Sequence, residues 1–442
     1  MELFGTDGIR FLTVQDKNKE LVYSPFFISR IGYAAARVLK KGKYILVWDT
    51  RKSSHHISYT FSAVLSSFGF ETLLGGVLPT PSVSALIISL GLSGGFSVSA
   101  SHNPPEFNGI KFFLENGLKA DEDTEAKIES EFSKFSEDKI TCQISHIRNF
   151  EDVAYSAYVS FIKNLFPKGF LRGLKIVLDC SNGATYKVAP HIFSSFLADI
   201  ELVGCNPDGE NINVGVGSEN PNAALRKSGD FKLIFDGDGD RILIGDSKGN
   251  LYDGDHIISL LTRFMKDEGK LKGAVVGTIL SNKALEDFVK NKLGARFERV
   301  NVGDRNIAYK MREIGSNIGG EESGHIILSD IVPTGDGIIV GLQTLFYILK
   351  SGKDLSDLVI KKYYQAKGKI DVPKKEDLGS EKFSFLHKIF SDIERAGGRA
   401  VVRYSGTEPV LRVMVEHADE SFAERYKDII IGELSPIFRN QA

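Results

Sequence analysis

Three short apolar segments, far apart in the chain, most constrain how this sequence folds. They are Tyr44–Asp49, Leu174–Asp179 and Gly273–Thr278, and a helical pattern of apolar positions follows each one. A short, continuous apolar run that leads into a helix is typical of a strand buried on both faces of a parallel sheet. The sequence therefore predicts three α/β domains of related design, although only the pattern and not the residues recur.

The last part of the chain has a different pattern. Apolar runs at Ala400–Tyr404 and Val410–Glu416 flank a polar turn, and an amphipathic helix begins near Ser421. This order of elements predicts a smaller α+β domain at the C-terminus.

Charged or irregular stretches near residues 135–138, 247–250 and 367–375 suggest where the domains end. The last stretch is rich in Lys, Asp and Pro, and we expect it to be a linker. For a chain of 442 residues, we predict four domains, at 1–148, 149–250, 251–366 and 367–442.

The charge of the chain is almost balanced, with 55 Lys and Arg residues against 57 Asp and Glu residues. No global field would therefore draw the protein to nucleic acid or to an anionic membrane. The sequence lacks a long apolar run and the features of a signal peptide, and its three cysteines lack metal-ligand spacing. We expect a cytoplasmic protein with buried thiols that binds neither nucleic acid nor a membrane.

A loop that contains a serine is the first candidate for a reactive site. Gly95–Pro105 is a small-residue strand that stops where prolines forbid its continuation, so Ser101 is presented on a loop. His102 follows directly, but adjacent side chains on an extended segment point away from each other, which makes it a poor base for Ser101. Taken alone, such a serine is more often satisfied by backbone contacts.

A lysine in the next strand is a second candidate. Lys111 interrupts the apolar pattern of Phe107–Phe113. Held near Ser101, its ammonium group could serve a phosphate or move a proton. As an isolated residue, it is more often solvated.

Asp236, Asp238 and Asp240 give the strongest chemical signal, because they share one glycine-rich turn between two apolar strand patterns. Three carboxylates so close repel one another unless a cation joins them, and hard oxygen ligands predict Mg²⁺ or Ca²⁺. A calcium-binding EF-hand needs Gly where Arg241 stands and Glu where Ser247 stands. Mg²⁺ bound here would keep open positions that a phosphate oxygen can fill. The alternative is a solvated acidic turn.

Two further loops carry groups that suit a phosphorylated sugar. A glycine-rich run contains Glu321, Ser323 and His325, which offer the hydrogen-bonding groups that sugar hydroxyls require. The turn Arg403–Pro409 offers a guanidinium, hydroxyls and backbone N–H groups that together suit an anion. Arg10 is another candidate for binding phosphate, whereas no nucleotide-binding motif is present.

Five loops resemble, in order, the signature loops of the α-D-phosphohexomutase superfamily. They are Gly5–Arg10, Ser99–Pro104, Asp236–Arg241, Gly320–His325 and Arg403–Pro409, and they span almost the whole chain. The resemblance implies three related α/β domains with mixed sheets and a smaller α+β domain around a central cleft.

Three more segments are most similar to those of bacterial phosphoglucosamine mutases: Val302–Arg305, Ser323–Asp330 and Thr334–Gly337. This branch implies an isomerase that interconverts glucosamine 6-phosphate and glucosamine 1-phosphate through a phosphoserine and a 1,6-bisphosphate. A phosphoglucomutase or phosphomannomutase, or more remotely a Mg²⁺-dependent sugar phosphatase, is the alternative. A homodimer is a possible assembly.

The resemblance also implies roles for single residues. Mg²⁺ would bind to phosphorylated Ser101, Asp236, Asp238 and Asp240. The catalytic residues would be Ser101, Lys111, His325, Arg10 and Arg241, with Lys111 and His325 as proton handlers. The substrate would be bound by Glu321, Ser323, Arg403, Ser405, Gly406 and Thr407. From charge alone, and not from the resemblance, we expect the pair Glu321–Glu322 to favour the protonated amine of glucosamine phosphate over a neutral hydroxyl.

Overall fold

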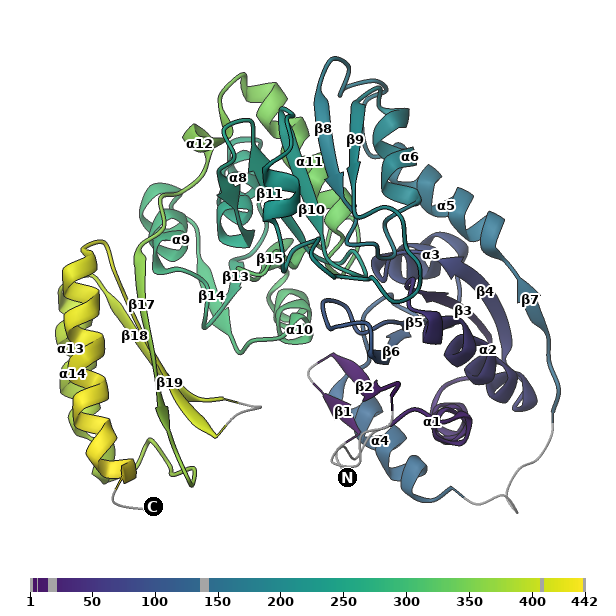
Figure 1. The fold of residues 1–442 in the computed structure, drawn as a ribbon, viewed down its shortest axis with the longest axis horizontal. Helices are drawn as coiled ribbons and strands as arrows, with labels where there is room; N and C mark the ends of the chain where they lie inside the picture. The colour runs from purple at the N-terminus through teal and green to yellow at the C-terminus, as the bar shows by residue number, and fades with distance from the viewer. Residues whose placement is uncertain (1–2, 6, 15–21, 136–142, 406–408, 440–442) are drawn as a thin grey trace.

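The computed structural model describes residues 3–439, apart from residues 6, 15–21, 136–142 and 406–408 (Figure 1). The described residues form four sheets. Figure 1 shows them along an arc, with the N-terminal sheet at one end and the C-terminal sheet at the other.

The first sheet is mixed. Its seven strands lie in the order β1 (Phe4–Gly5), β2 (Gly8–Leu12), β6 (Phe107–Leu114), β5 (Gly94–Val98), β3 (Lys43–Trp48), β4 (Glu71–Val77) and β7 (Ile147–Asn149). The strands from β5 to β7 are parallel, whereas β6, β2 and β1 add antiparallel pairs at one edge. The associated helices are α1 (Pro25–Val38), α2 (Lys52–Ser67), α3 (Pro81–Leu90) and α4 (Glu122–Ser133).

The second sheet ends in the hairpin that carries the acidic turn. Its five strands lie in the order β12 (Leu251–Tyr252), β11 (Ile242–Asp246), β10 (Phe231–Phe235), β8 (Lys175–Asp179) and β9 (Asp199–Val203). Strand β8 is parallel to both neighbours, and β10 pairs with β11 in antiparallel fashion. The helices of this part are α5 (Glu151–Lys163), α6 (Val188–Ser195) and α7 (Asn222–Leu225).

The third sheet has four strands and carries the glycine-rich run at one edge. Their order is β14 (Phe297–Val300), β13 (Val275–Thr278), β15 (Ile318–Gly320) and β16 (Ile326–Leu328). The helices are α8 (Gly254–Asp267), α9 (Lys283–Asp287) with a π-helical turn (Phe288–Lys292), α10 (Asp304–Ile314), α11 (Gly337–Ser351) and α12 (Leu355–Leu358). Strand β13 is parallel to β14 and β15, and β15 forms an antiparallel hairpin with β16.

The three strands predicted from the apolar segments are β3, β8 and β13, and each pairs in parallel with two neighbours. They are apolar throughout because a parallel strand in the middle of a sheet is covered on both faces; β3, for example, is buried from Tyr44 to Trp48. The predicted α/β fold class with mixed sheets is confirmed.

The fourth sheet is antiparallel and small. It consists of β17 (Tyr364–Asp371), β19 (Val410–His417) and β18 (Arg399–Tyr404), with α13 (Phe385–Arg395), α14 (Glu420–Arg439) and a 3-10 turn (Glu381–Phe383) beside it. The prediction of a linker at residues 367–375 is wrong in its first half, because β17 continues to Asp371. Its apolar Ala366 and Ile370 are buried, while Lys367 and Lys369 alternate with them on the other face.

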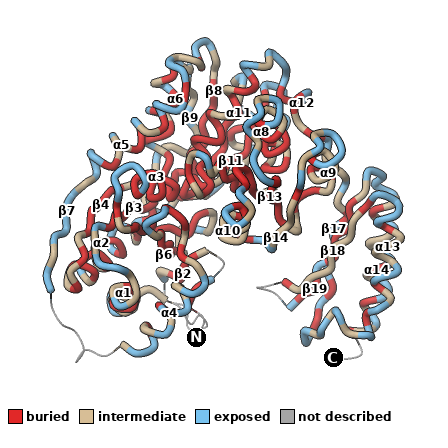
Figure 2. Tube along the Cα trace, turned by 180° about the vertical axis from the view of Figure 1, so that it is seen from behind, coloured by how far each residue is buried: buried red, intermediate tan, exposed pale blue. Residues whose placement is uncertain are grey.

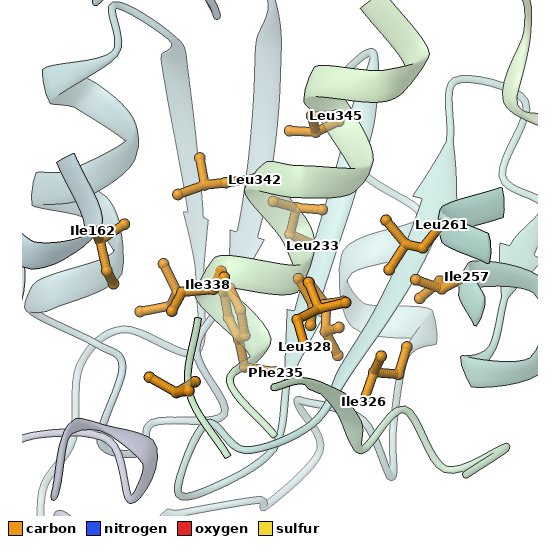
Figure 3. Packing of buried hydrophobic residues seen from close by; sticks show 14 of the residues in the cluster. Ile162, Leu233, Phe235, Ile257, Leu261, Ile326, Leu328, Ile338, Leu342 and Leu345 are labelled. Atoms are coloured by element: carbon orange, nitrogen blue, oxygen red, sulfur yellow. The ribbon is translucent and has the colours of Figure 1, made fainter. Parts of the chain in front are cut away.

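The largest cluster of buried apolar residues joins parts of the first, second and third sheets. Figure 2 shows buried residues concentrated in the strands and in α8 and α11, with exposed residues along the outer faces of α13 and α14. Helix α11 is almost entirely buried, and Figure 3 shows its Ile338 and Leu342 between Ile162 of α5 and Leu233 of β10. A helix that is apolar all round needs such a location in the interior.

Among the described residues, none of the helices combines the length and the apolar sequence that crossing a membrane requires.

Candidate active site

Ser101 lies just beyond β5, in a backbone conformation that side chains rarely adopt. Its φ angle is 51°, and the residue is only 1% exposed. The Oγ of Ser101 donates a hydrogen bond to Oδ2 of Asp236 at 2.5 Å. A serine from the first sheet therefore points into the acidic turn of the second.

A buried ion pair supports the serine loop. Asp49 and Arg51 follow β3, and their side chains are fully buried against each other. Asp49 Oδ2 accepts a hydrogen bond from Ser99 Oγ at 2.7 Å, and Ser99 Oγ accepts one from the N–H of Ser101 at 3.0 Å. Arg51 Nη2 donates to the carbonyl oxygen of Ser101 at 3.2 Å. The backbone of Ser101 is thus held at both its N–H and its carbonyl.

Asn213, from the second sheet's connecting loops, holds the same carbonyl. Its Nδ2 donates to the carbonyl oxygens of Ser101 at 2.9 Å and of Asn103 at 3.0 Å. The acidic turn also approaches closely here, since a Cβ added to Gly237 would lie 2.5 Å from the carbonyl oxygen of Ser101. This contact between two loops explains why the turn needs glycine at that position.

The prediction that His102 points away from Ser101 is wrong. It assumed an extended segment, whereas the left-handed backbone of Ser101 places Nδ1 of His102 3.5 Å from Ser101 Oγ. Burial, together with Arg241 and Arg10, lowers the pKa of His102 to about 4, so the imidazole is neutral at physiological pH. The contact is long, and the short hydrogen bond of the serine goes to Asp236.

Asp236, Asp238 and Asp240 converge at the tip of the β10–β11 hairpin. One ligand atom from each lies within 4.8 Å of the others, and all three residues are buried. The alternative of a solvated acidic turn is therefore excluded. Burial, with the two neighbouring carboxylates, raises the pKa of Asp236 well above its ordinary value. A bound cation would relieve this repulsion.

The hydrogen bonds of the triad leave oxygen atoms that could ligate a metal. Asp238 Oδ2 accepts hydrogen bonds from Thr80 Oγ1 at 2.5 Å and from Lys111 Nζ at 2.8 Å. Within the described part of the chain, Oδ1 of Asp238 and Oδ1 of Asp240 are buried and have no hydrogen-bond partner. Unpaired buried carboxylate oxygens are unfavourable, so this set of donors fits a hard divalent cation.

Lys111 is buried beside the triad and is not solvated. Its Nζ lies 2.8 Å from Asp238 Oδ2, 3.4 Å from Asp240 Oδ2 and 2.6 Å from Asp7 Oδ2. Burial alone would lower the pKa of Lys111, but the three carboxylates raise it well above its ordinary value. Strand β6 places this residue, because Lys111 pairs with Ser97 of β5 just before the serine loop.

A cavity of 270 Å³ opens between the N-terminal strands, the acidic turn and the third sheet. Its wall is strongly polar and contains most of the predicted catalytic residues. The lining residues are Asp7, Arg10, His102, Asp240, Arg241, Val302, Gly303, Asp304, Glu321 and His325.

His325 is held between carboxylates in this wall. Its Nδ1 lies 3.5 Å from Asp240 Oδ2, and its Nε2 lies 3.7 Å from Asp304 Oδ2 and accepts a hydrogen bond from the N–H of Gly335 at 3.2 Å. Burial would lower the pKa of His325, but Asp240 and Asp304 raise it above its ordinary value. A β-bridge to Arg241 fixes the histidine next to the acidic turn.

Glu321 and Glu322 face different cavities. Glu321 lines the 270 Å³ cavity, accepts a hydrogen bond from the N–H of Gly303 at 2.9 Å and is contacted by Ser323 Oγ at 3.4 Å. Glu322 instead lies 3.9 Å from Lys362 and 4.0 Å from Lys367, beside the C-terminal sheet. Its carboxylate is therefore engaged by lysines.

Arg403 and Ser405, the predicted phosphate-binding residues that the structure describes, do not line the 270 Å³ cavity. Arg403 lines a second cavity, of 390 Å³, together with Lys369 and Arg412, which stand in the same row of the sheet. Ser405 is buried just beyond β18. Gly406 and Thr407 lie outside the described residues.

Four models of phosphoglucomutase/phosphomannomutase domains match the chain in order. The alpha/beta/alpha domains I, II and III match residues 1–139, 156–249 and 253–365, and the C-terminal domain matches residues 369–433. The chain belongs to this family. It is accordingly a phosphohexomutase, an enzyme of the isomerase class.

Individual relatives of this phosphohexomutase agree with that assignment. The chain is 38% identical to a phosphoglucosamine mutase of Methylococcus capsulatus, with 99% of both chains covered. In structure it is similar to a phosphoglucomutase/phosphomannomutase family protein of Burkholderia thailandensis, with a TM-score of 0.77, 20% identity and coverage of 97% and 96%. It is also similar to Aspergillus fumigatus N-acetylphosphoglucosamine mutase in complex with GlcNAc-6P and magnesium, with a TM-score of 0.68, 16% identity and coverage of 99% and 96%.

Several residues at the site of this phosphohexomutase were missed by the sequence reasoning. Arg51 and Asn213 hold the serine loop, while Asp7, Lys119 and Asp304 form ion pairs beside the cavity. Asp7 and Asp304 lie within segments that carry the family resemblance, so the resemblance could have identified both as site residues. Asn213 and Lys119 stand in no recognisable motif.

Proposed function

We propose that the protein is a phosphoglucosamine mutase that interconverts glucosamine 6-phosphate and glucosamine 1-phosphate. The observation that carries the reaction is the buried contact of Ser101 Oγ with the Asp236–Asp238–Asp240 triad, beside a polar cavity that can take a sugar phosphate. The substrate assignment is supported by full-length relatives that carry this name.

The reaction needs two phosphoryl transfers. Phosphorylated Ser101 gives its phosphoryl group to the free hydroxyl of the sugar monophosphate, so that the Oγ–P bond breaks, a sugar O–P bond forms and the hydroxyl proton is taken up by the site. The resulting 1,6-bisphosphate turns over, its other sugar O–P bond breaks, the Oγ–P bond of Ser101 forms again, and the site returns the proton to the sugar oxygen that is freed. No other reactant is consumed, and the enzyme ends as it began.

Asp236, Asp238 and Asp240, with an oxygen of phosphorylated Ser101, are proposed to hold Mg²⁺. The unpaired Oδ1 atoms of Asp238 and Asp240 support this ligand set. When bound, the ion would neutralise charge on the phosphoryl group during transfer.

The other charged residues of the site have different roles in this proposal. Lys111 is fully buried, paired with three carboxylates and absent from the cavity wall, so it serves as a fixed positive charge. His325 lines the cavity and is the group that exchanges a proton with the sugar hydroxyl. Arg10 and Arg241 line the same cavity and supply electrostatic support.

Substrate binding is assigned to two places. Glu321 and Ser323 would bind sugar hydroxyls at the first cavity, while Arg403 and Ser405, together with Gly406 and Thr407, would bind the phosphate that does not react. The row of Lys369, Arg412 and Arg403 supports an anion site on the C-terminal sheet. Since this row lines a different cavity from Glu321 and His325, the two cavities can bind one substrate only if the C-terminal sheet approaches the others. We also propose that the chain consists of four domains, with the boundaries 1–148, 149–250, 251–366 and 367–442.

The test is to compare the isomerisation of glucosamine, glucose and mannose 6-phosphates by the purified, Mg²⁺-loaded protein. We expect the highest kcat/KM for glucosamine 6-phosphate and no release of inorganic phosphate. A preference for glucose or mannose phosphate would overturn the substrate assignment and leave the proposed mutase reaction intact. Because Glu322 is engaged by lysines, we expect Glu322→Gln to leave the ratio of glucosamine to glucose turnover unchanged.

A further inference from the structure

A second lysine, Lys119, lies on the opposite side of Asp7 from Lys111. Its Nζ is 2.6 Å from Oδ1 of Asp7, whose Oδ2 is 2.6 Å from Lys111. Lys119 also forms a close ion pair with Oδ2 of Asp304 and lies 4.0 Å from Oδ2 of Asp240. The Lys119 side chain is 10% exposed, so these contacts occur largely out of water.

The ion pair with Asp304 joins two parts of the chain that are remote in sequence. Lys119 belongs to the turn that follows β6, and Asp304 is the first residue of α10 (Figure 1). Two more contacts cross the same boundary, since Tyr309 donates a hydrogen bond to the carbonyl oxygen of Lys119 at 3.0 Å and Arg305 forms an ion pair with Glu125. The start of α10 is thereby attached to the sheet that bears Ser101.

Asp304 connects Lys119 to the wall of the 270 Å³ cavity. Asp304 and the adjacent Gly303 line this cavity, and the N–H of Gly303 donates to Glu321 at 2.9 Å. The same Oδ2 of Asp304 that pairs with Lys119 lies 3.7 Å from Nε2 of His325. A shift of Asp304 would therefore displace both the candidate sugar ligand and the candidate proton handler.

Lys119 also balances charge at this cavity. Four of the lining residues are acidic: Asp7, Asp240, Asp304 and Glu321. A phosphorylated sugar brings further negative charge, and in a buried site an unpaired carboxylate repels it strongly. Lys119 neutralises Asp7 and Asp304 without occupying the cavity wall.

We propose that Lys119 is a positioning residue for the phosphohexomutase reaction. It fixes Asp304 and the start of α10 against the serine-bearing sheet, and so keeps Glu321 and His325 in place around a phosphorylated sugar. This inference rests on the proposed function, because it needs a sugar phosphate as the occupant of the cavity.

The experiment compares kcat and KM of the full-length, Mg²⁺-loaded wild type with those of Lys119→Met, Lys119→Arg and Asp304→Asn. We expect Lys119→Met to lower kcat/KM about 100-fold, with a lower kcat and a higher KM, because Asp304 loses its close lysine partner whereas Asp7 keeps Lys111. Lys119→Arg should recover most of this loss, since it keeps the charge and the donors. Adding Lys119→Met to Asp304→Asn should cost less than about 3-fold, because both changes break the same ion pair.

Lys127→Met is the matched control, because Lys127 is an exposed lysine of α4 that forms an ion pair with Asp123 of the same helix. It should keep the wild-type kcat/KM. The proposal is overturned if folded Lys119→Met, identified by a wild-type circular dichroism spectrum, retains wild-type kcat/KM, or if Lys119→Arg is as impaired as Lys119→Met. If Lys119→Met does not fold, Asp304→Asn tests the proposal instead. Wild-type kcat/KM in Asp304→Asn then overturns it. A wild type that isomerises no hexose phosphate would instead refute the proposed function.

Discussion

Asn213 offers a direct test of how the serine loop is held, because it reaches Ser101 from another sheet. Its Nδ2 donates to two carbonyl oxygens, those of Ser101 at 2.9 Å and Asn103 at 3.0 Å. We expect Asn213→Gly to lower kcat with little effect on KM, since the bonds position the serine and do not contact the cavity. Glycine is the right replacement because Asn213 has a φ angle of 62°, which alanine would adopt only with strain.

The size of the effect follows from the balance of bonds and strain. Two hydrogen bonds to neutral carbonyls contribute about 2 kcal/mol together. The left-handed conformation of Ser101 costs roughly 1–2 kcal/mol, so the two terms are comparable. Arg51 still donates to both carbonyls in the variant. A loss of up to ~2 kcal/mol corresponds to a fall in kcat of up to about 30-fold.

The assay is steady-state isomerisation, with the phosphoserine content of each sample measured by intact mass. Asn213→Asp should be worse than Asn213→Gly, since a carboxylate cannot donate and would face two carbonyl oxygens. Asn164→Gly, at an exposed position after α5, serves as the control. Wild-type kcat in fully phosphorylated Asn213→Gly would refute the reasoning.

Three further outcomes are expected. Ser101→Ala should remove the phosphoserine and reduce isomerisation at least about 1000-fold, because it removes the phosphoryl carrier; phosphopeptide mapping with kinetics checks this, and full activity would contradict it. Asp238→Asn should raise the Mg²⁺ concentration needed for half-maximal activity at least about 10-fold, measured by metal titration, and an unchanged requirement would remove the triad from the metal site. Burial raises the pKa of Asp336 from 3.8 to about 6, so the native state loses up to ~3 kcal/mol of stability from this group as the pH rises from about 4 to above 6. Asp336→Asn does not titrate, so its Tm relative to wild type should increase over this pH range, and a constant difference would contradict the assignment.

The fold class and most of the candidate site could be predicted because their signals are local. The apolar runs of β3, β8 and β13 follow directly from burial on both faces of a parallel strand. The convergence of Asp236, Asp238 and Asp240 follows from their alternation with glycine in a tight turn. Each of these features can be recognised from residues that are neighbours in the sequence.

The errors and omissions arise where distant segments meet. The backbone of Ser101 is left-handed because groups from three other places hold it, and nothing in its own sequence indicates this; the misplacement of His102 follows from that. Lys119 and Asn213 act through partners more than 100 positions away, so no local spacing indicates them. The sequence predicts a linker where the later residues of β17 lie, because the exposed lysines there obscure the alternating pattern to which the buried Ala366 and Ile370 belong.

The core of the C-terminal sheet is separate from the larger cores. Its cluster of buried apolar residues runs from Ala366 to Phe438 and includes none from the first three sheets, whereas the largest cluster joins β3, β8 and β13. Cooperative unfolding spreads through shared packing, so the C-terminal part forms its own cooperative unit. A core mutation there would therefore disturb the row of Lys369, Arg412 and Arg403 while Ser101 and the Asp236–Asp238–Asp240 triad stay folded.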